Sequence, residues 1–282
     1  MLDTRRHFHR GNWHSDHEGE LHLSEWAAEA AGTAVLMLVI VSVVSFDFSP
    51  GSPLEHLLPS IGARLLLAGL LIAGSGSLVA ISPLGRLSGG HLNPAVTFGF
   101  WVTGHVRRHD LLGYIAGQVL GAFAGASLGA LLWGSRASAV HFAATHPGHG
   151  FHDSDAAAVE ALMTGVLLLV IFVLNASNRT MRLTPVATWL LVATMVWQAA
   201  PYTGTSLNPA RSLAPAVLDR DPASLWVYLV APLVGAAAAA ALVQGGALRR
   251  PLTAKMFHDS SYRSVMQTIV PTTADRSGGP GQ

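Results

Sequence analysis

The chain carries one short motif twice: GGHLNPAV at residues 89–96 and GTSLNPAR at residues 204–211. In each copy, Asn precedes a Pro that would take the first position of a helix, where Pro loses no intrahelical hydrogen bond and Asn is a favoured cap. A short apolar segment follows, at residues 94–102 and 209–218. At about 1.5 Å per residue, it reaches roughly half of a hydrocarbon core about 30 Å thick. The motif therefore predicts two re-entrant half-helices buried in protein or lining a wet cavity.

Six other stretches have the roughly 20 apolar residues that a membrane span requires: residues 24–46, 61–82, 111–133, 156–175, 183–202 and 225–248. Only 12% of the 282 residues are charged, about half the share in a soluble domain. Three spans per half is an odd number, so the repeats at about 24–133 and 156–248 must have opposite orientations. We predict an all-α membrane protein whose two half-helices enter from opposite faces and meet near the midplane.

The basic residues predict the orientation. With the N-terminus in the cytoplasm, thirteen of the 17 Lys and Arg residues fall inside, and only Arg64, Arg136, Arg211 and Arg220 fall outside. This positive-inside bias places both termini in the cytoplasm. We expect cytoplasmic tails at 1–20 and 249–282 around a channel domain at 21–248. The first tail lacks the apolar core of a signal peptide.

Charge and cysteine content exclude other classes of function. A net charge of +1 gives no indication of a nucleic-acid partner. The absence of Cys removes disulfides and thiolate metal sites.

Paired Asn-Pro-Ala motifs, one in each three-span half, resemble the signature of the aquaporin or major intrinsic protein family. The similarity covers about residues 25–244 and includes Ala28-Glu29 before Gly32-Thr33, and residues 114–118 followed by Gly121-Ala122. Glu29 with Thr33 also has a counterpart in the second half, Glu160 with Thr164. It implies a passive channel for water and small uncharged solutes in the plasma membrane, with no enzymatic activity, cofactor or bound metal. It also implies a homotetramer in which each subunit has its own pore.

The motif residues suggest how such a pore would work. Asn93 and Asn208 can accept backbone N–H bonds with their oxygens and turn their amide groups toward the lumen. Pro94 and Pro209 would begin the half-helices, and the small Ala95 and Ala210 would let the helix ends approach closely. Two positive helix ends at the midplane disfavour cations and protons there.

The family resemblance places the selectivity constriction at Ala73, Val196, Thr205 and Arg211. A charged residue such as Arg211 inside a membrane segment is itself a candidate functional residue. Water-selective members carry an aromatic ring and a His at the first two positions, so we expect a wider, less polar gap here. Further family markers are mixed, because Ser212, Ala216 and Tyr228 match water channels whereas Leu229 matches glycerol facilitators. Glycerol, urea, hydrogen peroxide, and boric or arsenous acid all stay open as solutes.

Three titratable groups have a structural and a functional interpretation. Glu29 and Glu160 are intramembrane carboxylates, and the family resemblance implies that they hold the backbone N–H groups of the half-helix loops, the alternative being proton relay. His91 is expected to be hydrogen-bonded within its loop, the alternative being a titrating gate.

Two groups of histidines lie outside the motifs, and we expect both to belong to solvated loops, although metal binding and pH sensing are conceivable. They are His141, His146, His149 and His152 in the outer loop, and His7, His9, His14 and His17 in the N-terminal tail.

Two other classes of protein were weighed. A secondary transporter also uses inverted repeats and broken helices. An intramembrane enzyme would use Ser88 and His91 as nucleophile and base, but no third residue that would orient them is evident.

Overall fold

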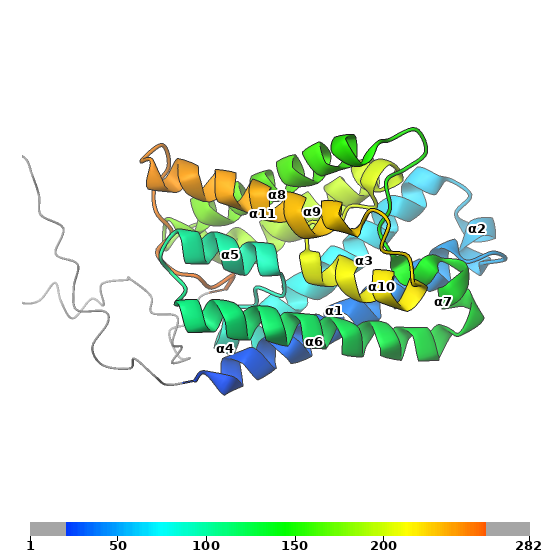
Figure 1. Ribbon diagram of the computed structural model, residues 1–282, viewed down its shortest axis with the longest axis horizontal. Helices are drawn as coiled ribbons and strands as arrows, with labels where there is room; N and C mark the ends of the chain where they lie inside the picture. The colour runs from blue at the N-terminus through cyan, green and yellow to red at the C-terminus, as the bar shows by residue number, and fades with distance from the viewer. Residues whose placement is uncertain (1–20, 258–282) are drawn as a thin grey trace, which may run out of the picture.

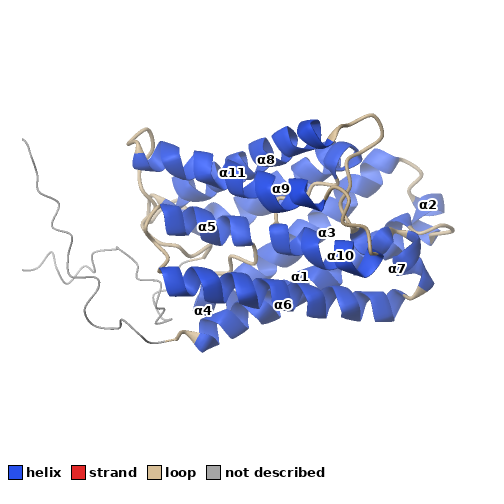
Figure 2. Cartoon of the chain, in the orientation of Figure 1, coloured by secondary structure: helices blue, strands red, loops and turns tan. Residues whose placement is uncertain are grey.

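The computed structural model describes residues 21–257, and this part of the chain is entirely helices and loops (Figure 2). It contains six helices long and apolar enough to cross a membrane. They are α1 (Leu23–Phe48), α3 (Ile61–Ile81), α6 (Arg108–Trp133), α8 (Asp153–Asn175), α9 (Thr184–Thr203) and α11 (Leu225–Gln244). The predicted all-α architecture with six spans is confirmed.

Two shorter helices lie inside the bundle, α5 (Pro94–Val102) and α10 (Pro209–Asp219). In Figure 1 they extend from the middle of the molecule toward opposite ends. The first has its predicted bounds, and the second is one residue longer than predicted. They are the two half-helices of the fold.

The bundle has two distinguishable ends. The start of α1 and the end of α11 lie together at the left of Figure 1, which we call the termini end. The opposite loop end carries α2 (Pro53–Leu57) and α7 (Ser135–Ala139), followed by the 3-10 turn η1 (His141–Ala143). These short elements, like α4 (Pro83–Ser88) and η2 (Met181–Leu183), were not predicted because each is too short to show a hydrophobic period.

The two halves are built by the same helix pairing, α1 against α6 and α8 against α11. Glycine permits both close approaches. A Cβ added at Gly121 of α6 would lie 2.1 Å from the Ala30 carbonyl oxygen of α1, and one added at Gly235 of α11 would lie 2.1 Å from that of Ala161 in α8. Small residues at such contacts let membrane helices pack closely without a hydrophobic driving force between them.

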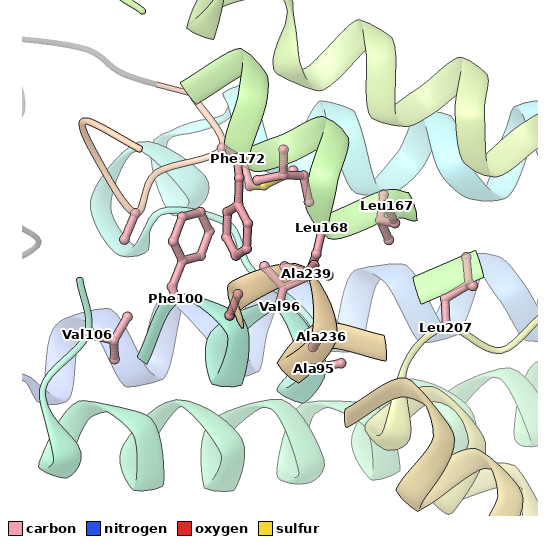
Figure 3. Packing of buried hydrophobic residues seen from close by; sticks show 14 of the residues in the cluster. Ala95, Val96, Phe100, Val106, Leu167, Leu168, Phe172, Leu207, Ala236 and Ala239 are labelled. Carbon is pink, nitrogen blue, oxygen red and sulfur yellow. The ribbon is translucent and has the colours of Figure 1, made fainter. Parts of the chain in front are cut away.

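A hydrophobic cluster supports α5 from behind. Figure 3 shows Phe100 of α5 facing Phe172 of α8, with Leu168, Val96 and Ala239 close by. The Phe100 and Phe172 rings meet edge to face with centroids 5.3 Å apart, a favoured aromatic geometry. This packing fixes the half-helix against α8 and α11.

After α11 the chain turns back and packs across the termini end through Phe257. The Leu252 amide donates to the Asn175 carbonyl at 2.8 Å, and the Met256 amide donates to the Gly89 carbonyl at 2.8 Å. Lys255 is 1% exposed, and its Nζ donates to the Arg86 carbonyl at 2.9 Å. The region predicted as a tail from residue 249 therefore begins with a packed segment, residues 251–257. The predicted tail residues 1–20 and 258–282 lie outside the described residues.

Candidate functional site: a cavity between two half-helices

A cavity of about 330 Å³ runs through the bundle beside both half-helices. Its lining extends from Val140 and Ala143 at the loop end to Met256 at the termini end. Asn93 and Asn208 both line it. The cavity therefore passes the two motifs, as a pore through this fold must.

Each motif Asn caps its own half-helix and also reaches the other loop. Asn93 Oδ1 accepts from the Ala95 amide at 2.8 Å, and Asn208 Oδ1 accepts from the Ala210 amide at 3.0 Å. Asn93 Nδ2 donates to the Leu207 carbonyl and Asn208 Nδ2 to the Leu92 carbonyl, both at 2.8 Å. An amide nitrogen has two hydrogens, so each Asn keeps a second donor beyond this cross-loop bond.

The helix starts are tightly enclosed. Pro94 and Pro209 occupy the first helical positions, as predicted. Ala95 is 0% and Ala210 is 1% exposed. A larger side chain at either position would separate the two loops that the Asn amides join.

Glu29 of α1 is fully buried and accepts four hydrogen bonds around the first loop. Its Oε1 accepts from Ser88 Oγ at 2.6 Å and from the His91 amide at 3.0 Å. Its Oε2 accepts from the Leu92 amide at 2.7 Å and from Gln118 Nε2 at 2.7 Å. The carboxylate thus satisfies loop donors that would otherwise be buried without partners.

Glu160 of α8 does the same for the second loop. Its Oε1 accepts from Thr203 Oγ1 at 2.8 Å and from the Ser206 amide at 2.9 Å, and its Oε2 accepts from the Leu207 amide at 2.8 Å. This geometry supports the structural interpretation of both carboxylates over proton relay.

His91 is held on both ring nitrogens. Nδ1 lies 3.1 Å from Thr97 Oγ1, within its own loop segment, and Nε2 lies 2.5 Å from the Ala254 carbonyl of the packed C-terminal segment. The second contact was not predicted. Ser88 Oγ donates to Glu29 Oε1, and both ring nitrogens of His91 have other partners, so these two side chains are not arranged as a nucleophile and its base.

The remaining predicted positions also line the cavity: Ala73 on α3, Val196 on α9, Thr205 in the second loop, and Arg211 in the first turn of α10. Arg211 Nη1 donates to the Ala143 carbonyl of η1 at 2.9 Å. Thr205 Oγ1 donates to the Met195 carbonyl at 3.3 Å. The tertiary structure thus brings residues from four separate regions of the chain to one lumen.

Three participants were missed from the sequence. Met256 lines the cavity although it follows the last span by twelve residues, and nothing in its local pattern indicated this. Ala143 contributes a backbone carbonyl, which no side-chain motif can reveal. Gln118 ends a segment that matches the family but was assigned no role; its amide bonds Glu29 and Thr97, and an amide side chain in an apolar span was the signal for such a role.

Among the histidines outside the motifs, the structure describes some of the predicted candidates and reveals one further buried ring. The N-terminal histidines lie outside the described residues. His105, in the loop after α5, was not singled out, yet its Nε2 lies 2.8 Å from the Pro251 carbonyl. Burial lowers the pKa of the His105 imidazole below its ordinary value, so the bond to the C-terminal segment is made by the neutral ring at pH 7.

Comparison with known proteins agrees with this geometry. Residues 18–243 match the family model described as Major intrinsic protein. The chain is 32% identical over 210 residues to aquaporin TIP4-1 of Zea mays, covering 74% of this chain and 79% of the relative. It is 35% identical over 191 residues to the lens fiber major intrinsic protein of Gallus gallus, covering 65% of this chain and 70% of the relative.

A solved structure shares the fold. The aquaglyceroporin from Plasmodium falciparum superimposes with a TM-score of 0.64 at 25% identity, covering 78% of this chain and 95% of that one. The chain therefore belongs to the major intrinsic protein family of membrane channels, which pass water and small neutral solutes and are not enzymes.

Proposed function

We propose that this channel conducts water and at least one larger uncharged solute, with selectivity set by Ala73, Val196, Thr205 and Arg211. The observation that carries the proposal is that these four residues line one cavity. Arg211 is the only Lys, Arg, Asp or Glu among the described residues that line it.

The chemistry of these side chains suits a small polyol or a similar solute. Arg211 supplies donors for a solute oxygen, and Thr205 Oγ1, whose hydrogen is donated to the Met195 carbonyl, can accept from a solute hydroxyl. Ala73 and Val196 offer small apolar walls against which carbon can lie. The positive N-termini of α5 and α10, together with Arg211, oppose cations and protons. Residues Ser212, Ala216, Tyr228 and Leu229 leave glycerol, urea, hydrogen peroxide, and boric or arsenous acid as candidates, and the names of the relatives include both aquaporins and an aquaglyceroporin.

Stopped-flow swelling of proteoliposomes against a panel of these solutes tests the proposal. Wild type should pass water and at least one larger solute. The double variant Ala73→Phe with Val196→His narrows the gap from two sides, so it should lose the larger solute and retain water. Matched oligomer yield from gel filtration is the control for folding. Wild type that passes water alone, or a double variant with unchanged solute flux, contradicts this assignment.

A secondary transporter is the alternative, and the same proteoliposomes distinguish the two. A channel carries solute down its own gradient at a rate that an imposed proton gradient does not change. Glu29 accepts four hydrogen bonds and Glu160 accepts three. This favours the channel, because both carboxylates hold the loops and neither is left as a proton-coupling site. Uptake driven by a proton gradient would favour the transporter.

The setting of the channel is part of the proposal. We infer that residues 21–248 form the channel domain, that the termini end faces the cytoplasm, and that the protein is a homotetramer in the plasma membrane. The basis is the positive-inside bias and the family resemblance. Labelling of single introduced cysteines from either side tests the orientation, and light scattering in detergent tests the oligomeric state.

A further inference from the structure

Two histidines and two aspartates meet at the loop end of the bundle, where the cavity opens toward η1. The ligand atoms of His146, Asp219 and Asp221 all lie within 4.8 Å of one another. His141 borders the group, since its Nδ1 lies 3.0 Å from Asp219 Oδ2 and its ring centroid lies 6.1 Å from that of His146. The cluster joins the loop after η1 to the end of α10 and the loop that follows.

The backbone on both sides of His146 is anchored. Thr145, just before it, is 5% exposed, and its Oγ1 lies 2.7 Å from Ser212 Oγ of α10. Gly148, two residues after it, donates its amide to the Tyr202 carbonyl at 2.8 Å. His146 is therefore held in position by contacts that do not involve its own side chain.

The two aspartates are also positioned by the fold. Asp219 ends α10, the helix to which Thr145 is joined, and its side chain is 14% exposed. The Asp221 amide donates back to the Ala216 carbonyl at 3.1 Å, and Asp221 Oδ1 accepts from the Ala223 amide at 3.0 Å. Oδ2 of Asp221 remains as a second acceptor on that carboxylate.

We propose that His146, Asp219 and Asp221 form a binding site for a divalent transition-metal ion of the zinc type, with His141 as a fourth ligand or as the partner that orients Asp219. Imidazole nitrogen together with carboxylate oxygen is a donor set that suits zinc, whereas calcium and magnesium take oxygen ligands alone. Ligand atoms around tetrahedral zinc, with bonds of about 2.0 Å, lie roughly 3.3 Å apart. Rotation of surface side chains can close the remaining separation.

The site has a consequence for the pore. The Ala143 carbonyl, which holds Arg211, belongs to the same loop three residues before His146. An ion bound to His146 and Asp219 would join this loop to α10, which carries both Arg211 and Asp219.

Zinc binding to the full-length protein tests the proposal directly. The protein is prepared without a polyhistidine tag, stripped with chelator, and titrated with Zn²⁺ alone by calorimetry. His7, His9, His14 and His17 are all replaced by Ala in every variant, so that the N-terminal tail adds no ligands. One ion should bind per chain, and zinc should raise the Tm of this background protein.

Matched single substitutions then locate the ion. His146→Ala and Asp219→Asn should each weaken zinc binding at least about tenfold, as the loss of a ligand or its support does. His149→Ala, an exposed histidine in the same loop, should leave the affinity and the Tm shift unchanged. X-ray absorption of the zinc-loaded protein should show a shell of nitrogen and oxygen without sulfur.

Three outcomes would overturn the site. The first is the absence of any zinc-dependent Tm shift or binding heat in the background protein, a result that does not depend on whether a variant folds. The second is unchanged affinity in His146→Ala, and the third is an equal loss in His149→Ala.

Discussion

The two re-entrant loops share the same backbone arrangement and hydrogen bonds, which we call the frame, and differ in the side chains that they present to the cavity. In both, a buried Glu from the first span of the half accepts two consecutive loop amides. In both, a Leu adopts a positive φ directly before the capping Asn, 52° at Leu92 and 58° at Leu207. The repeat therefore preserves the backbone bonds that keep irregular chain buried in a membrane.

The differences are concentrated at aligned positions. Gly90, with φ 68°, corresponds to Thr205, with φ 48°, and Val96 corresponds to Arg211. The first loop is also backed by the C-terminal segment through His91 and the Ala254 carbonyl. The second loop instead presents a hydroxyl and a guanidinium to the cavity. The same backbone arrangement therefore serves as support in one half and as a candidate selectivity filter in the other.

Removing one of the two carboxylates that hold the loops should have the largest effect, a loss of folding stability. Glu160→Ala and Glu29→Ala each leave two buried amides without an acceptor, at a cost of about 1–3 kcal/mol for each. We expect severe loss of folded protein and a lower Tm by scanning fluorimetry for both. Glu55→Ala, an exposed Glu on α2, is the control. A wild-type Tm in either variant would show that the shared frame does not depend on the carboxylate.

Replacing Arg211 by Val, the residue at the equivalent position of the first repeat, should change ion selectivity without unfolding the protein. Arg211→Val installs the residue found at position 96 and removes a fixed positive charge while both capped half-helices remain. Cation or proton leak should rise while water flux persists, measured with a pH-sensitive dye in proteoliposomes. A variant that stays tight to ions would show that the helix dipoles suffice without Arg211.

Replacing Thr205, which has a positive φ, by the Gly found at the equivalent position of the first repeat should have a smaller effect, and on thermal stability. Any residue with a Cβ is disfavoured at positive φ by roughly 1–2 kcal/mol, and Gly has no such cost. Thr205→Gly should therefore keep a Tm near that of wild type, whereas Thr205→Ala, which keeps the strain and loses the hydroxyl, should melt lower. Equal Tm values for the two variants would show that this φ is not under strain.

The smallest effect is expected at the termini end. Met256→Ala shortens a cavity-lining side chain far from the proposed constriction, so solute permeability should rise only modestly and the order of solutes should not change. His105→Ala, which removes the bond to Pro251 without altering the lining, separates loosening of the segment from widening of the cavity. A changed order of solute permeabilities in Met256→Ala would show that the selectivity filter lies at the termini end.

The architecture could be predicted from the residues alone. Apolar length predicts membrane spans because lipid requires it, and the Asn-Pro pairs marked the helix starts to the residue. The odd number of spans per half predicted the inversion. The matching positions of Glu29 and Glu160 marked the repeat, whereas their role in holding the loops came from the family resemblance.

The way in which distant parts of the chain complete the cavity could not be predicted from the residues and became visible in the folded protein. The Ala143 carbonyl meets Arg211, and residues 251–257 fold back so that Met256 enters the lining. The cross-loop bonds from Asn93 to Leu207 and from Asn208 to Leu92 also arise only when the halves meet. These contacts use backbone atoms and long-range packing, which leave no periodic or compositional trace in the residues that make them.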